Sequence, residues 1–128
     1  MQNRSMDYIG HMLEAAQLAC SYIEGFDKND FLADKRTQQA VILNIVVMGE
    51  AAGKLVQDNP LLVEHYPQVP WKSIKGMRNR IAHGYFDINL DIVWDTVRDA
   101  LPPFIETLII IRDSLAVAAN QDSDNTSS

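Results

Sequence analysis

The sequence has almost no cysteine. Its 128 residues contain one, Cys20, so the chain can form neither an internal disulfide nor a cysteine zinc site. That usage favours a reducing, cytoplasmic setting. Long apolar runs are missing as well. The N-terminal stretch MQNRSMDYIGHMLEAA is polar and lacks a continuous apolar segment, so we expect no signal peptide. No run approaches the roughly 20 apolar residues of a membrane helix, so we expect no membrane association.

Patterns that hold metals and cofactors are also missing. The sequence has no glycine-rich phosphate loop, and its three histidines are scattered at positions 11, 65 and 83. We therefore expect no metal site and no cofactor.

Positive charge is scarce and unevenly placed. The net charge is -6 and the sequence pI is about 4.8, which argues against indiscriminate binding of nucleic acid. Yet no acidic residue occurs from His65 to Phe86. This window holds the basic side chains of Lys72, Lys75, Arg78 and Arg80. An anionic ligand is therefore expected to bind at residues 72–83.

The spacing of apolar residues is helical almost throughout, and 47% of the residues are apolar, enough for a real interior. The sequence predicts a single-domain, all-α bundle of five or six helices over residues 1–118, followed by a polar, disordered tail over 119–128. The stretch AVILNIVVM is also compatible with a strand. Its flanks favour a long buried helix from about 34 to 56.

Local signals indicate where helices begin and end. Asp27 or Asp30 can cap a short turn, Pro60 suits the first position of a short helix, and Asn89 can cap the helix that follows it. The pair Pro102-Pro103 is expected to break or sharply kink the path. The last helix, from Phe104, is apolar over much of its girth, which indicates either self-association or a fully internal helix.

Arg78 lies on the apolar face of the helix expected at residues 70–84, next to Ile74 and Ile81 on a helical wheel. A guanidinium there must pair, lie at an interface or line a cleft, because its unpaired burial costs several kcal/mol. The conservative interpretation is that Arg78 snorkels to solvent or pairs with a carboxylate such as Glu50.

Asn79 and His83 are four residues apart, so their side chains can touch on the polar side of this helix. Arg78 and His83 are five apart, about 140° around the wheel, so on one straight helix they diverge. They could converge if the helix unwinds before Gly84 or if two chains bring their helices together. A histidine at a helix C-terminus is also a plain charge–dipole contact, and Tyr85 could be a recognition or modification site or a capping contact.

Residues 78–85, RNRIAHGY, match the pattern R-x4-H-x-Y, and the context extends to VPWKSIKGM before them and TQQAVILNIVVMGEAAGKL further upstream. Over about residues 5–116 the chain resembles the HEPN ribonucleases. The likeness is greatest to the HepT-like toxins, which are paired with a minimal nucleotidyltransferase antitoxin, MntA. The resemblance implies an antiparallel homodimer whose motif helices meet in a shared cleft.

The resemblance also implies a reaction. In this family a ribose 2′-OH attacks the neighbouring phosphate of RNA without a metal and leaves a 2′,3′-cyclic phosphate. His83 would transfer protons, Arg78 would bind the phosphate charge, and Asn79 would orient either group. From the acid-free basic window, Lys72, Lys75 and Arg80 are expected to bind RNA in this cleft, and Glu50 is expected to pair with Arg78.

Tyr85 would be adenylylated by the antitoxin, which would fill the cleft and repel RNA phosphate. Two other interpretations stay open at this stage. One is a HEPN module that binds nucleotide or a nucleotidyltransferase without cleaving RNA. The other is a purely structural helical dimer.

Overall fold

The structure, a computed structural model, describes residues 4–126, with side chains through residue 121. Within that range the chain is helical, without strands. The α-helices are α1 (Ser5–Tyr22), α2 (Lys28–Ala33), α3 (Lys35–Asp58), α4 (Pro60–His65), α5 (Trp71–His83), α6 (Leu90–Asp95) and α7 (Leu101–Thr126). A 3₁₀ turn, Tyr85–Asp87, follows α5, and a π turn, Thr96–Ala100, joins α6 to α7. Counted with this joint as one helix, the described chain has six α-helices, so the predicted all-α bundle is confirmed.

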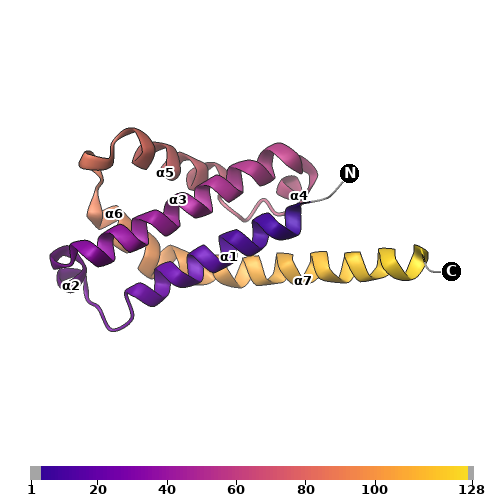
Figure 1. Cartoon of the computed structure of the whole chain (residues 1–128), viewed down its shortest axis with the longest axis horizontal. Coiled ribbons are helices and arrows are strands. Elements are labelled where there is room, and N and C mark those ends of the chain that lie inside the picture. Colours follow the sequence, from indigo (N-terminus) through magenta and orange to yellow (C-terminus); the bar gives the residue numbers. More distant parts are fainter. Residues whose placement is uncertain (1–3, 127–128) are drawn as a thin grey trace.

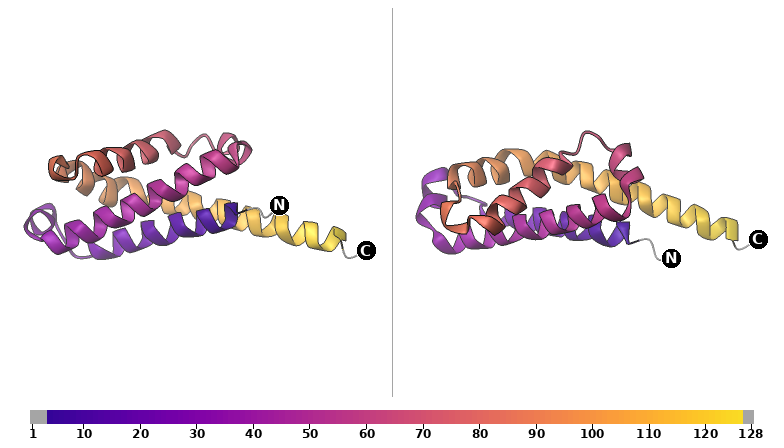
Figure 2. Two further views of the ribbon diagram at one scale, coloured as in Figure 1. Left: turned by 45° about the horizontal axis from the view of Figure 1, so that its top comes forward. Right: turned by 90° about the horizontal axis from the view of Figure 1, so that it is seen from above.

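Helix α3 is the centre of the bundle. It packs against α1 along one side and against α5 along another, while α7 packs against α1 (Figures 1 and 2). Phe31, Val41, Leu55 and Leu108 are among the side chains that are fully excluded from solvent. Within the described range, α3 is the one helix long and apolar enough to cross a membrane by length and composition. Half of its apolar stretch is buried in the bundle, as expected for a core helix.

The predicted helix starts are confirmed where they can be compared. Asp27 is the N-cap of α2 and forms a reciprocal capping box with Asp30. Pro60 opens α4, and the side chain of Asn89 accepts the backbone N–H groups of Asp91 and Ile92 at the start of α6. These local signals set where α2, α4 and α6 begin.

The proline pair does not break the helical path. Pro102 and Pro103 occupy the second and third positions of α7, directly after the π turn, and the ribbon changes direction between α6 and α7 (Figure 1). Proline is tolerated in the first helical turn because its missing N–H has no helical partner there. The wider π turn absorbs the adjustment.

Helix α7 is longer than predicted. It runs to Thr126 and extends past the rest of the bundle (Figure 1), because neither proline nor glycine interrupts residues 104–126. The tail predicted at 119–128 falls on the end of α7, apart from residues 127 and 128, which lie outside the described range. The predicted domain boundary at residue 118 stays a prediction. Leu108 and Ile111 are buried, while Ile110 is 60% exposed, so one chain covers most of the apolar girth of α7.

Cys20 is partly buried, and its thiol donates to the carbonyl oxygen of Val97 at 3.6 Å. Burial raises the pKa of the Cys20 thiol, which lowers the fraction of reactive thiolate at neutral pH. We therefore expect iodoacetamide to label native Cys20 more slowly than a free thiol, and at the free-thiol rate in denaturant. Equal rates in the two conditions, followed by mass spectrometry, would contradict this placement.

Candidate active site

The site begins at a close approach between two antiparallel helices. Gly49 of α3 faces Arg78 and Ile74 of α5. An added Cβ at Gly49 would overlap the Cβ of Arg78, lie 2.9 Å from its Cγ and lie 3.3 Å from the carbonyl oxygen of Ile74. The missing side chain at Gly49 therefore lets the stem of Arg78 lie directly on α3.

The Arg78 guanidinium is held on two sides. Its Nη2 forms an ion pair with Glu50, and its Nη1 donates to the Oδ1 of Asn79 at 2.9 Å. The pairing with Glu50 is the conservative interpretation made from the sequence. Its Nε is buried without a hydrogen-bond partner among the described residues. Each terminal nitrogen keeps a second N–H, so this guanidinium can still bind two oxygens of a phosphate.

An open groove of about 230 Å³ surrounds this guanidinium. It lies between α3 and α5, and its lining is mostly polar. The lining residues are Gly49, Glu50, Gly53, Lys54, Gln57, Lys75, Arg78 and Asn79. One carboxylate therefore stands among three cations, which makes the groove suited to an anion in an otherwise acidic chain.

His83 lies outside this groove. It is the last residue of α5, which stays helical to its end, so the unwinding that could have brought His83 to Arg78 does not occur. Five residues of helix separate the two along the axis by about 7.5 Å. The His83 side chain is exposed and has no hydrogen-bond partner among the described side chains. One chain therefore does not bring the two motif residues together.

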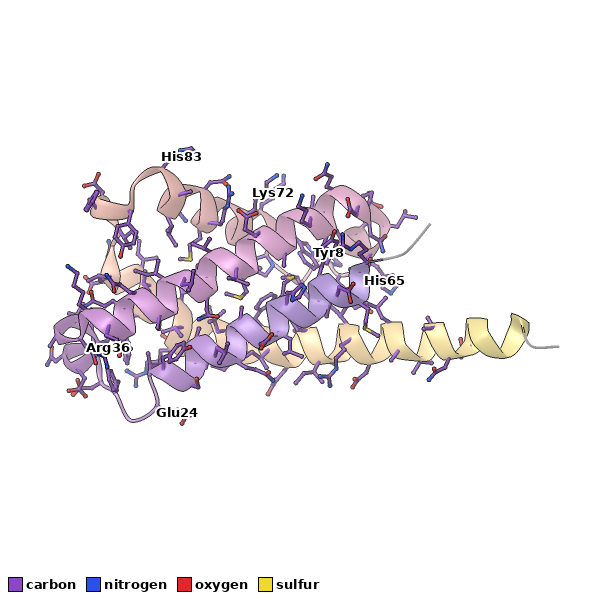
Figure 3. The ribbon with its side chains drawn as sticks, viewed as in Figure 1. Tyr8, Glu24, Arg36, His65, Lys72 and His83 are labelled. Carbon is purple, nitrogen blue, oxygen red and sulfur yellow. The ribbon has the colours of Figure 1, made fainter. Side chains whose placement is uncertain are left out.

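Among the described side chains, Asn79 forms a hydrogen bond with Arg78 and not with His83: its Oδ1 accepts from the guanidinium. Lys72, Lys75, Asn79 and His83 follow one another at spacings of three or four residues, which places them along one ridge of α5. Figure 3 shows Lys72 and His83 on the side of α5 that faces away from α1 and α7. This ridge is polar and accessible along the whole helix.

Arg80 lies apart from that ridge. It lines two small pockets of about 150 and 190 Å³ on the side of α5 that faces α6 and α7. Two residues along a helix turn the side chain by about 200°, which explains the separation from Arg78. Its predicted role in RNA binding stays a prediction, and the geometry gives it no share in the groove.

Tyr85 begins the 3₁₀ turn that follows α5 and is 45% exposed. Its ring meets that of Phe86 edge to face, with centroids 5.8 Å apart, and Phe86 is almost fully exposed. The Tyr85 hydroxyl has no hydrogen-bond partner among the described side chains, and its roles as a capping contact or a modification site stay predictions.

Sequence reasoning missed Lys54 and Gly49 as parts of the site. The sequence pattern that could have pointed to them is their spacing from Glu50. Gly49 is its neighbour, and Lys54 is one turn further along the same face of α3. That spacing becomes informative only once α3 is known to lie against α5. Among the described residues no group of three or more His, Cys, Asp or Glu side chains lies close enough to hold a metal ion.

The described chain is all-helical and carries an arginine and a histidine of the pattern R-x4-H on one helix, α5, as the HEPN resemblance implies. Residues 12–111 match the family described as HepT-like, ribonuclease HepT-like, and the chain belongs to this family. It is 43% identical over 86 residues to "Putative RNase MJ0127" of Methanocaldococcus jannaschii, covering 66% of this chain and 69% of that protein. It is 32% identical over 102 residues to "Probable ribonuclease HepT" of Thermococcus cleftensis, covering 80% and 90%. No solved structure gives a significant match.

Proposed function

We propose that this protein is the toxin of a toxin–antitoxin pair and an endoribonuclease that cleaves RNA without a metal, in a cleft completed by two chains. The observation that carries the proposal is the Arg78 guanidinium, fixed by Glu50 and Asn79 at the wall of an open, cation-lined groove. Membership of a ribonuclease family supports the choice of RNA as the ligand. The single unpaired cysteine is compatible with a cytoplasmic protein.

The reaction requires proton transfer and charge stabilisation. The ribose 2′-oxygen bonds to phosphorus and loses its proton to a base, while the bond to the 5′-oxygen breaks and that oxygen takes up a proton. The products are a 2′,3′-cyclic phosphate and a free 5′-hydroxyl. His83 carries the proton transfers, worth about 10²–10⁴-fold. The free N–H groups of Arg78 stabilise the charge that develops on the phosphate oxygens.

A homodimer supplies what one chain lacks. Leu43 and Val47 precede Glu50 by seven and three residues, which places them on the same face of α3, and they are 62% and 39% exposed. An apolar surface beside a polar site is typical of a contact between subunits. Two antiparallel copies joined at this surface would bring His83 of one chain toward Arg78 of its partner.

Purified protein that carries no modification is therefore expected to cut single-stranded RNA in EDTA. Arg78→Ala is expected to lose about 10²-fold or more of this activity, because the charge on the phosphate is then unmatched. Arg112→Ala is the control, since Arg112 lies on α7, away from the groove, and pairs with Asp113. Equal cleavage by the Arg78→Ala variant and the parent protein would refute the assignment of Arg78.

Tyr85 is the proposed point of control by an MntA-like nucleotidyltransferase. The Tyr85 oxygen would attack the α-phosphorus of ATP and lose its proton, and pyrophosphate would leave. The exposed tyrosine two residues after His83 supports this role, because an adenylyl group there would block RNA. Coexpression with such a partner is expected to raise the intact mass by whole adenylyl units. Tyr85→Phe should abolish the gain and Tyr22→Phe should not, whereas a gain that persists in Tyr85→Phe would place the modification elsewhere.

A second candidate function is binding without cleavage. The groove of a single chain contains Arg78 but not His83, so a monomer can bind a phosphate there without the motif histidine. The EDTA cleavage assay separates the two functions. RNA that is bound but left intact by the dimer would favour the binding module.

A further inference from the structure

The groove between α3 and α5 continues beyond Arg78 into a part that the cleavage chemistry does not use. From Gly49 and Arg78 it runs toward the C-terminal end of α3, where Gly53, Lys54 and Gln57 face Lys75 of α5. The two helices are antiparallel (Figure 1). Lys54 is one helical turn beyond Glu50 on α3, so this part of the groove lies about 5 Å from Arg78 along the helix axis. It leads away from His83, which is at the opposite end of α5.

The two glycines give the groove its shape. The space above Gly49 is filled by the stem of Arg78, whereas a Cβ at Gly53 would meet nothing within 4 Å. The floor is therefore closed at the arginine and open one turn further along. The whole groove has a volume of about 230 Å³, which suits a sugar–phosphate unit rather than a single water molecule.

The charges in this open part have no partner of their own. Neither Lys54 nor Lys75 forms an ion pair with any described side chain, whereas Lys28 pairs with Asp91 at 3.1 Å. Glu50 is paired with Arg78, and Asp58 near the end of α3 accepts a hydrogen bond of 3.0 Å from the hydroxyl of Tyr8 on α1. Two uncompensated lysines from facing helices thus converge on one open space in a chain of net charge -6.

We propose that Lys54 and Lys75 bind the backbone phosphate next to the scissile one, with the adjoining ribose lying over Gly53. This rests on the proposed RNA cleavage and extends it, since it fixes the direction in which the strand leaves the reacting centre. Lysine ammonium groups suit this task because they hold a phosphate as point charges without a fixed geometry. The subsite would position the strand, and it takes no part in proton transfer.

The test uses an RNA oligonucleotide with one cleavable linkage. All its riboses are 2′-O-methylated except the one whose 2′-hydroxyl attacks that linkage. The linkages on either side of the cleavable one are replaced in turn by a neutral methylphosphonate. For the parent protein, one of these replacements is expected to lower kcat/KM about 10-fold. Lys54→Gln and Lys75→Gln should each lower it to a similar extent on the unmodified backbone, and Lys35→Gln, at the other end of α3, should not.

Combining a lysine variant with the neutral linkage shows whether the lysine binds that phosphate. Once the linkage is neutral, Lys54→Gln should cost nothing further, because both changes remove the same contact. Binding of fully 2′-O-methylated RNA should lose about 0.7 from the slope of log K against log salt for each lysine removed. Lysine variants that match the parent, or losses that simply add, would overturn the subsite. Failure of the parent to cleave would count against the proposed function instead, and the binding slopes would still test the subsite.

A steric variant gives an independent measurement. Gly53→Gln fills the open floor without changing charge and is expected to raise KM about 10-fold with little change in kcat. Gly10→Gln is the matched control, because a Cβ at Gly10 of α1 also meets nothing within 4 Å. Thermal unfolding of both variants shows whether each is folded. An unchanged KM in a folded Gly53→Gln protein would contradict a ribose at this position.

Discussion

Replacing His83 by alanine is expected to reduce RNA cleavage by about 10²–10⁴-fold while leaving the fold intact. The loss follows from the proposed role of the imidazole in moving protons between the 2′-oxygen, the solvent and the 5′-oxygen. Stability should change by no more than about 0.5 kcal/mol, because the side chain is exposed at the end of α5 and has no hydrogen-bond partner among the described side chains. Single-turnover cleavage and thermal unfolding measure the two effects separately.

His11→Ala provides the comparison for this variant. His11 is exposed on α1, a helix that does not line the groove, so its removal should leave both cleavage and stability unchanged. His83→Ala protein that is folded, binds RNA as the parent does and no longer cleaves it would match the proposed chemistry. Undiminished cleavage by a folded His83→Ala protein would mean that another group carries the proton.

Gly49→Ala is expected to destabilise the bundle by about 1–3 kcal/mol and to impair cleavage as well. The new Cβ would overlap the Cβ of Arg78 and crowd the Ile74 carbonyl, both on α5. Neither atom is the free end of a flexible side chain, so α5 itself has to move away from α3. Such a shift would also move the Arg78 guanidinium relative to Glu50, which sits on α3.

Gly53→Ala separates crowding from the general effect of removing a helical glycine. A Cβ at Gly53 meets nothing within 4 Å, so alanine there should stabilise α3 by up to about 1 kcal/mol. Urea unfolding of the two variants beside the parent protein is the measurement. Stabilisation by both substitutions would show that α3 and α5 are not in close contact at Gly49.

Much of the fold could be predicted because its determinants are local. The caps at Asp27 and Asn89 and the proline at the start of α4 depend on a few neighbouring residues, and each was identified from the sequence. The helical path that continues through Pro102-Pro103 was not identified, because the sequence predicted a break or a sharp kink there. It depends on the π turn just before the pair, which no residue pattern announces.

The site was only partly predictable for a different reason. The pairing of Arg78 with Glu50 could be anticipated, because a guanidinium on an apolar face needs a carboxylate. The contributions of Gly49 and Lys54 depend on the register of α3 against α5, which is a tertiary contact. The divergence of Arg78 and His83 was visible on the wheel, and the uninterrupted α5 leaves it in place.

The most direct test of a cleft completed by two chains is a heterodimer of Arg78→Ala and His83→Ala. The two variants are coexpressed with different affinity tags and purified through both. If the arginine of one chain works with the histidine of the other, each variant alone is nearly inactive and the heterodimer recovers about half of the parent activity, because one of its two symmetric sites is intact. A heterodimer as inactive as the separate variants would place both residues in one chain's site, and failure of the two chains to copurify would contradict the dimer itself.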